Sequence, residues 1–415
     1  MLIQKPKGTY DLLPEKARQR YFLEKRVREI FNIYNYSEIR TPTFEKTELF
    51  KRGIGEETDI VSKEMYTFKD NEFTLKPEMT APVIRAYIEN NLGNESPLQK
   101  LFYICNMFRR ERPQAGRFRE FSQFGAEAIG SSDPYIDAEM IILADSIIRS
   151  FGIEDSVIKI NTIGTAAERE TFFREFKGYL SGFLKELSAD SQRRYVINPL
   201  RILDSKVQGD LEILRDAPVL YNFLNDETKR NFQSILDILT QSGIEFETDN
   251  RLVRGFDYYT STTFEFVSEA LGAQNALLGG GRYDMLVQQL GGKPTPAIGF
   301  AAGIERLLMV MEAKKLLPDS DDNLKLFIVS MNKECKKFSF KLADRLRKQG
   351  VKCETDFLGR SLKAQMKEAN RSNSEYVIVI GDEELKNGTA NLKRMSDGTE
   401  IRMNDFDNIK NYLFK

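Results

Sequence analysis

Residues 98–130 carry the pattern that most limits how this chain can fold. The segments LFYICNMFRR, from Leu101, and FREFSQFGAEAIG, from Phe118, alternate apolar or aromatic residues with polar and basic ones. Alternation with a period of two predicts strands, and the polar loop ERPQAGR between them predicts an antiparallel pair. The chain is therefore expected to contain two long antiparallel strands joined by an arginine-rich loop.

Further elements are predicted on both sides of this pair. Helices are expected at 14–35, where Pro14 suits the first turn, and at 135–151. The segment SEIRTPTFE predicts a strand interrupted by Pro42, and hence an edge or a bulge. Residues 165–240 are charged and helical in pattern, which predicts an insertion between two halves of one domain. After it, LVRGFDYYTSTTFEF and ALLGGGRYDMLV predict strands with glycine-rich turns, and GFAAGIERLLMVMEA predicts a helix that begins near Ile298.

The C-terminal part has a different pattern. A polar linker at 319–323 precedes LKLFIVS, a helix at 334–349, VKCETD, a helix at 361–371 and YVIVIGD. Strands that alternate with helices predict an α/β module. The expected domains are therefore 1–322, with the helical insertion at about 165–240, and 323–415.

Composition narrows the class of protein. The 415 residues are 41% hydrophobic and 30% charged, as in a globular chain with a sizeable core. No apolar run reaches the roughly 18 residues of a membrane span, and the N-terminus lacks the apolar segment of a signal peptide. We therefore expect a cytoplasmic protein with no membrane partner. The three cysteines are scattered, which argues against a disulfide framework and a zinc site.

The chain contains no histidine. Mechanisms that need a protein imidazole are therefore excluded, including a Ser–His triad, a His-ligated metal and a His general base. Two origins fit this absence: deliberate removal of the residue, and selection for synthesis when histidine is scarce.

The net charge of −1 hides an asymmetry. Residues 325–415 carry 19 Lys plus Arg and 13 Asp plus Glu, a net of +6, so the remainder sums to −7. A basic C-terminal module indicates a polyanionic partner, and solvated surface lysines are the alternative.

Three arginine-containing segments are candidate anion sites. The loop FRRERPQAGRF can point guanidinium groups into one cleft, where they bind phosphate bidentately; an exposed charged hairpin is the alternative. Arg254 lies in an expected apolar strand beside two tyrosines, so its burial would require a ligand anion or Asp257 as partner. Arg306 follows small residues on an apolar helix, where a surface salt bridge is the alternative. The arginines in and beside the loop are Arg109, Arg110, Arg112, Arg117 and Arg119.

The segment GGGRYD at 279–284 lacks the spacing of a phosphate-binding loop. Its glycines are expected to permit a tight strand turn near a ligand.

The order of the motifs resembles that of class II aminoacyl-tRNA synthetases. They are KPEMT, FRRERPQAGRFREFSQFGAEAIG, LVRGFDYYT, GGGRYD and AIGFAAGIERL. LVRGFDYYT and GGGRYD resemble two signatures peculiar to histidyl-tRNA synthetases, and the resemblance covers essentially the whole chain. It implies an α+β fold, with an antiparallel catalytic sheet flanked by helices, a helical insertion and a C-terminal α/β anticodon-binding domain. It also implies a homodimer built on the helix and strand around Pro42.

The same resemblance implies ATP-dependent ligation of L-histidine to its cognate tRNA through a histidyl-adenylate. Arg109 and Arg306 would hold the ATP phosphates. Arg254 would be the catalytic arginine, between the substrate carboxylate and the α-phosphate. Glu111 and Phe118 would help to seat the adenine side of the site.

The resemblance also implies a histidine pocket. Glu78 and Thr80 would hold the amino group of the substrate. Glu127, with Tyr258 or Tyr259, would read the nitrogens of the imidazole. The residues that would line the pocket are Gln123, Glu127, Tyr258, Tyr259 and Tyr283.

This chemistry needs no protein base, because the substrate carboxylate is itself the nucleophile and attacks the α-phosphorus. Catalysis then consists of positioning and charge neutralisation by arginines and Mg²⁺, with no protein metal site expected.

Two residues depart from the family pattern. Ser122 stands where the family usually carries histidine, and Met79 stands where many members have glycine. Two other classes remain as alternatives. A non-catalytic paralogue, similar to the regulatory subunit of ATP phosphoribosyltransferase, would lack the anticodon module, and a tRNA-binding sensor would have lost the arginines. This sequence keeps both features.

Overall fold

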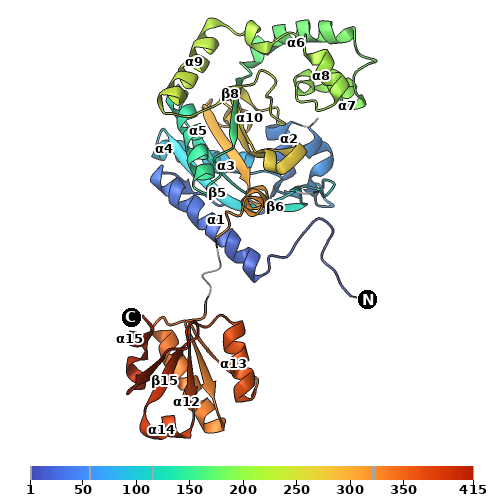
Figure 1. The fold of residues 1–415 in the computed structure, drawn as a ribbon. Coiled ribbons are helices and arrows are strands. Elements are labelled where there is room, and N and C mark those ends of the chain that lie inside the picture. Colours follow the sequence, from blue (N-terminus) through green and yellow to red (C-terminus); the bar gives the residue numbers. More distant parts are fainter. Residues whose placement is uncertain (1, 56–57, 115, 319–322, 415) are drawn as a thin grey trace. The chain divides into compact units, whose positions relative to one another are not determined.

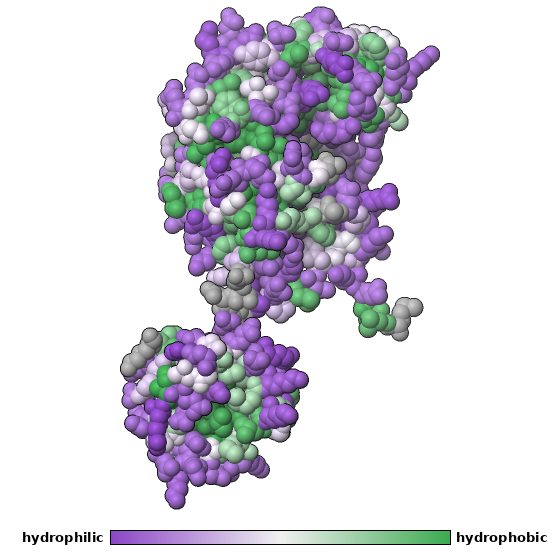
Figure 2. Space-filling view, viewed as in Figure 1, coloured by the Kyte–Doolittle hydropathy of each residue, from purple (hydrophilic) through white to green (hydrophobic). Residues whose placement is uncertain are grey.

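The computed structural model describes residues 2–55, 58–114, 116–318 and 323–414. The chain divides into two compact units, Met1–Pro318 and Asp319–Lys415 (Figure 1). In the space-filling view, polar side chains cover most of the visible surface of each unit and hydrophobic ones form scattered patches (Figure 2). No helix within the described ranges is both long and apolar enough to cross a bilayer.

Unit 1 is built on a sheet with the strand order β1-β5-β6-β11-β10-β9-β7-β8. The six central strands are antiparallel to their neighbours, and only the short edge strands β1 and β8 pair in parallel. The predicted antiparallel pair is confirmed as β5 and β6. The strands are β1 (Ser37–Glu38), β5 (Gln99–Phe108), β6 (Glu120–Ile129), β7 (Val157–Thr162), β8 (Glu247–Thr248), β9 (Thr260–Val267), β10 (Ala276–Arg282) and β11 (Ala297–Gly303).

Helices cover this sheet and form most of the segment that separates β7 from β8. The segment predicted as a helical insertion contains four α-helices, α6 (Ala166–Ser181), α7 (Ala189–Ile197), α8 (Gln208–Leu214) and α9 (Asp226–Gln241). The other helices of the unit are α1 (Pro14–Ile33), α2 (Thr47–Ile54), α3 (Thr80–Glu89), α4 (Leu92–Glu95), α5 (Pro134–Arg149), α10 (Leu286–Gln289) and α11 (Ile304–Ala313).

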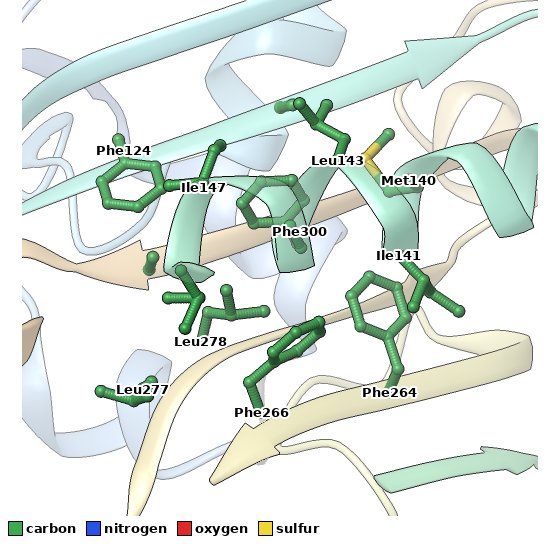
Figure 3. Packing of buried hydrophobic residues seen from close by; sticks show 14 of the residues in the cluster. Phe124, Met140, Ile141, Leu143, Ile147, Phe264, Phe266, Leu277, Leu278 and Phe300 are labelled. Carbon is green, nitrogen blue, oxygen red and sulfur yellow. The ribbon is translucent and has the colours of Figure 1, made fainter. Parts of the chain in front are cut away.

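The main core lies on one face of the sheet. Successive side chains of a strand point to opposite faces, so Phe124 and Ala126 of β6 face the core while Gln123 and Glu127 face the other way. Apolar side chains of α1, α5, α9 and α11 complete this core. Figure 3 shows its centre, where residues of α5 meet phenylalanines of β6, β9 and β11. The opposite face carries polar side chains together with a second apolar cluster, which includes Leu101 and Met107 of β5.

Unit 2 is an α/β module, as predicted. Its sheet has the order β13-β12-β14-β15-β16, with the first three strands parallel. Two further antiparallel strands, β15 and β16, were not predicted. The elements are β12 (Leu326–Ser330), α12 (Lys333–Lys348), β13 (Cys353–Thr355), α13 (Leu362–Arg371), β14 (Tyr376–Ile380), α14 (Asp382–Asn387), β15 (Ala390–Arg394), β16 (Glu400–Met403) and α15 (Ile409–Leu413).

Two predicted elements in unit 1 are wrong. The helix expected from Ile298 begins only at Ile304, because 297–303 forms β11 between β6 and β10. Gly299 and Gly303 are poor helix formers, and pairing on both sides decides for the strand. The strand expected from Leu252 begins only at Thr260. Arg254 therefore lies in an irregular segment rather than in a strand.

The segment around Pro42 also differs from the single interrupted strand that was expected. It forms two short strands in different sheets: β1 at the edge of the large sheet, and β2 (Phe44–Lys46) in a small sheet with β3 (Tyr66–Thr67) and β4 (Phe73–Leu75). Proline lacks the N–H that a continuous ladder requires, so the chain changes sheets there.

A buried ion pair joins the end of β10 to α5. Arg282 is 2% exposed and Asp137 is fully buried. The guanidinium donates from Nε to both carboxylate oxygens, at 3.0 and 2.9 Å, and from Nη1 to the carbonyl oxygen of Ser131 at 3.0 Å. The arginine of GGGRYD is thus satisfied inside the protein, which makes it a structural residue.

Asp137→Ala is expected to lower the free energy of unfolding by about 3–5 kcal/mol, because it removes the fully buried partner of the Arg282 guanidinium and leaves it only the half-buried Asp284, 3.1 Å from Nη1. The matched control is Glu312→Ala, which removes an exposed pair with Lys16 (48% and 61% exposed side chains) and should change stability by less than about 1 kcal/mol. The chain has no tryptophan, so urea unfolding is followed by circular dichroism. Equal effects of the two substitutions would contradict the structural role of Arg282.

Candidate active site

A cavity of about 640 Å³ opens in unit 1, on the face of the sheet opposite to the main core. Its walls come from the central strands, from the loop between β5 and β6, from the segment before β9 and from the helical insertion. Most of the site residues predicted from the sequence line this one cavity: Glu78, Thr80, Arg109, Glu111, Phe118, Gln123, Arg254, Tyr258, Tyr259 and Arg306.

The two remaining predicted residues lie buried beside Thr80. Glu127 accepts a hydrogen bond from Thr80 Oγ1 at 2.9 Å, and Tyr283 donates its hydroxyl to the other carboxylate oxygen. Glu127 and Tyr283 are each 1% exposed. They therefore connect to the cavity through Thr80 and do not form part of its open wall.

Arg109 and Arg306 present guanidinium groups held by backbone carbonyls. Arg109 donates from Nε to Pro77 O at 2.9 Å, and its guanidinium carbon lies 5.2 Å from the centre of the Phe121 ring. Arg306 donates from Nε to Gly116 O at 3.2 Å and from Nη1 to Ala276 O at 2.9 Å. Burial lowers the pKa of both guanidiniums. Carbonyl oxygens orient a guanidinium without neutralising it, so both charges remain available to an anion.

Arg254 is held on a different set of contacts. Its Nη1 donates to Glu265 Oε1 at 2.9 Å, and its guanidinium carbon lies 5.8 Å from the centre of the Tyr259 ring. Its Nε is buried and has no hydrogen-bond partner among the described residues. Asp257, one of the two partners expected from the sequence, instead accepts from Asn198 Nδ2 at 2.8 Å. Arg254 thus combines one ion pair with a buried donor that lacks a partner, which marks the residue for attention as a functional group.

The glycines of GGGRYD do not form the tight turn that was expected. They lie inside β10, paired with β9 and β11. A Cβ atom on Gly279 would overlap the guanidinium of Arg254. The glycine gives the arginine room to lie flat against the sheet.

Gly299 of β11 has the same relation to Glu127. The two residues are register partners, and a Cβ atom on Gly299 would overlap the Glu127 carboxylate. Burial raises the pKa of Glu127 to about 8, so the carboxyl group holds a proton at neutral pH.

Glu78 occupies the N-terminus of α3. Its two carboxylate oxygens accept from the backbone N–H groups of Thr80 at 2.7 Å and Ala81 at 3.0 Å. Burial raises the pKa of this carboxyl group. Each oxygen keeps a second lone pair for a further donor.

Sequence reasoning missed several contributors to the cavity, among them a tyrosine of β5 and the helical insertion. Tyr103 of β5 lines it, is 1% exposed, and pairs in register with Gly125, which leaves space for its ring. A large aromatic residue opposite a glycine on a neighbouring strand is the signal that could have revealed it. The insertion is another contributor, with Ser188, Arg194, Arg201 and Lys206 on the cavity wall.

The two departures from the family pattern have different surroundings. Ser122 alternates with Phe121 and Gln123, which line the cavity, so its own side chain points to the other face and bonds to Asn106 Oδ1 at 2.9 Å. Met79 lines the cavity and is buried beside Cys105, with the two sulfur atoms 3.7 Å apart. Of the two, only Met79 can touch a molecule in the cavity.

Comparison with known proteins covers both units. Residues 8–307 match the profile of the family described as histidyl-tRNA synthetase, and residues 325–414 match that of the anticodon binding domain. A histidine–tRNA ligase of Chloroherpeton thalassium is 46% identical over 98% of this chain and 97% of its own length. One of a Geobacillus species is 47% identical over 97% of both chains.

Solved structures agree with this assignment. The apo histidyl-tRNA synthetase of S. aureus superposes with a TM-score of 0.84 at 36% identity and covers 100% of both chains. A structure described as an ATP phosphoribosyltransferase regulatory subunit/histidyl-tRNA synthetase from Bacillus halodurans shares the fold at 23% identity, with a TM-score of 0.66, over 91% of this chain and 98% of its own.

The family profile covers the part of the chain that contains Arg109, Arg254 and Arg306, and the relatives match over nearly the full length. This chain therefore belongs to the histidyl-tRNA synthetase family.

Proposed function

We propose that this chain is a histidine–tRNA ligase: it activates L-histidine with ATP to form histidyl-adenylate and transfers the histidyl group to its cognate tRNA. The observation that carries the proposal is the cavity itself. Arg109, Arg254 and Arg306 line the same cavity, and a buried carboxyl group, Glu127, lies behind Thr80. Three guanidiniums suit a triphosphate, and a protonatable carboxyl group suits an imidazole.

The first step needs positioning more than acid–base catalysis. The carboxylate of histidine attacks the α-phosphorus in line, and pyrophosphate leaves. Arg109 and Arg306 would bind the phosphates, with Glu111 and Phe118 on the adenine side. Arg254 would bridge the substrate carboxylate and the α-phosphate with its guanidinium group, because the residue lines the cavity. Charge that develops on the phosphate oxygens is then neutralised by groups already in place.

The amino acid would be held by two sets of groups. Glu78 and Thr80 would bind its ammonium group, because each Glu78 oxygen still has an unused lone pair. Gln123, Tyr258 and Tyr259 would enclose the ring, and Tyr283 would support Glu127 behind it. Such a pocket rejects apolar amino acids, since they would leave its buried polar groups unpaired.

Mg²⁺ would enter with ATP. Among the described residues, no group of three or more His, Cys, Asp or Glu side chains is placed to hold a metal ion. In nucleotide sites this ion uses one or two carboxylates together with phosphates and water. Glu265 fits this role, because it lines the cavity and is partly exposed. Its Oε1 binds Arg254, so its Oε2 would bind the ion. The bound ion would supply neutralisation of phosphate charge.

Unit 2 would bind the anticodon end of the tRNA, as its basic net charge suggests. A homodimer would form through α1 and the strands around Pro42, where Tyr21 and Ile33 expose large apolar surfaces. The domain limits proposed from the sequence, 1–322 and 323–415, and a cytoplasmic location belong to the same proposal.

The activity is tested by exchange of labelled pyrophosphate into ATP. Histidine is expected to support exchange, and none of the other standard amino acids should do so, because only its ring pairs with Glu127 and the tyrosines. Equal exchange with a second amino acid would refute the assignment. A regulatory paralogue, the other reading of the fold, would show no exchange with any amino acid.

Arg254→Ala is expected to slow single-turnover adenylation about a hundredfold, which corresponds to roughly 3 kcal/mol of transition-state stabilisation. The Kd for ATP should change by less than about threefold, because the contact strengthens only as charge develops. Arg251→Ala, an exposed arginine three residues earlier, is the matched control and should behave as wild type. Adenylation by Arg254→Ala at the control rate would remove Arg254 from the mechanism.

The pH dependence of kcat/KM for histidine is expected to be bell-shaped. The free imidazole has a pKa of about 6.5. The pKa of Glu127 is about 8. The complex is expected to hold one proton between the imidazole and the Glu127 carboxyl group. Between the two pKa values a neutral ring meets a protonated carboxyl group, so binding exchanges no proton with solvent. Below the lower value binding must release a proton, and above the upper value it must take one up. Affinity therefore falls on both sides.

Glu127→Gln separates the two limbs. The variant should lose the upper limb and keep the lower one, which belongs to the substrate because the chain has no histidine. The profile is measured by histidine-dependent pyrophosphate exchange at subsaturating histidine. An upper limb that persists in the glutamine variant would assign it to another group.

A further inference from the structure

The segment before α1 lies along the arginine-rich loop between β5 and β6. We call residues 7–10 the N-terminal strap. The backbone N–H of Arg119 donates to Gly8 O at 2.8 Å, and its Nη1 donates to Lys7 O at 3.3 Å. Arg119, predicted to face an anion, therefore spends its donors on the strap and on Glu111 O, at 3.3 Å from Nε.

Gly8 is required for this close approach. Its φ of +89° lies in the left-handed region, and a Cβ atom would lie 2.8 Å from Pro113 Cγ and 2.9 Å from Arg119 Cγ. A larger residue would be strained and would push the strap away from the loop.

Tyr10 connects the strap to the cavity wall without lining the cavity. Its ring centre lies 4.9 Å from that of Phe118, and its hydroxyl donates to Glu305 Oε1 at 2.5 Å. Phe118 and Glu305 both line the cavity. Burial raises the pKa of Tyr10 above its ordinary value, so the hydroxyl remains a donor throughout the physiological range.

Glu305 joins three parts of the site. Besides Tyr10, its carboxylate accepts from the backbone N–H of Ser122 on β6, at 2.9 and 3.1 Å. It also lies in the first turn of α11, directly before Arg306. The Glu305 carboxylate therefore ties the first turn of α11, which also carries Arg306, to β6.

We propose that the N-terminal strap is a positioning element of the ATP site, and that Tyr10 is its positioning residue. Tyr10 acts through two neighbours: it holds the Phe118 ring on the adenine side and fixes the Glu305 carboxylate that orients the Arg306 turn. This inference rests on the proposed function, because it assumes that the loop and Arg306 bind ATP. It adds that the segment before the first helix sets the affinity for ATP and leaves the histidine end of the cavity unaffected.

The test compares Tyr10→Phe, Tyr10→Ala and the wild type by titration with ATP alone, with histidine alone in a second series. Tyr10→Ala loses both contacts and should weaken ATP binding about tenfold, whereas Tyr10→Phe keeps the ring contact and should weaken it about threefold. Histidine binding should change by less than about twofold in both variants. Tyr135→Ala, an exposed tyrosine at the start of α5, is the matched control and should match the wild type.

A graded loss confined to ATP supports the inference. Unchanged ATP binding, or equal losses of ATP and histidine binding, would overturn it. Gly8→Ala provides a second route to the same result, because it displaces the same strap. The double variant Gly8→Ala/Tyr10→Ala should bind ATP as tightly as the single variant with the lower ATP affinity, because both substitutions act through one strap. Independent, additive losses would also overturn it.

Direct binding keeps this result separate from the proposed function. If the wild type binds ATP but shows no histidine-dependent exchange, the ligase assignment fails while the strap is still tested by ATP affinity. If exchange is normal and Tyr10→Ala binds ATP as the wild type does, the strap inference fails alone. Circular dichroism of each variant checks folding, and Tyr10→Phe serves as the readout where Tyr10→Ala does not fold.

Discussion

The alternation of side chains across the central antiparallel strands is the constraint on which unit 1 depends. On β6, Phe124 and Ala126 face the helices, and Gln123 and Glu127 face the other way. One face of the sheet can then be a dry core while the other carries charge, with only the thickness of a backbone between them. A slip of one residue in register would exchange the two faces, so the core holds the site in place.

Large charged side chains lie flat on this sheet because glycines on neighbouring strands leave room for them. Arg254 lies over Gly279, and Glu127 lies beside Gly299. Burial in these positions leaves Arg254 with a free donor and Glu127 with a raised pKa. The same close packing that costs solvation therefore prepares each group to meet a ligand charge.

The charged groups proposed for catalysis at this site are arginines, and none of them is a histidine. Arg109, Arg254 and Arg306 remain charged at all physiological pH values, and backbone carbonyls or one carboxylate fix their directions. Adenylate formation suits such a site, since its nucleophile is already ionised. The enzyme can therefore lack histidine, and the only imidazole at its centre would be that of the substrate.

The sequence by itself determined the antiparallel pair β5–β6, the helical insertion, the α/β module and the motifs that carry the arginines, because these depend on local periodicity and on the order of short segments. Tertiary structure alone decided that 297–303 is a strand, since pairing with β6 and β10 outweighs the helical pattern that follows it. It also decided that Arg254 pairs with Glu265 and not with Asp257, that Arg282 is a structural partner of Asp137, and that Tyr10 reaches Glu305. Those contacts join residues that are up to 295 positions apart in the chain, and no local pattern records which distant side chain folding will bring within hydrogen-bond distance.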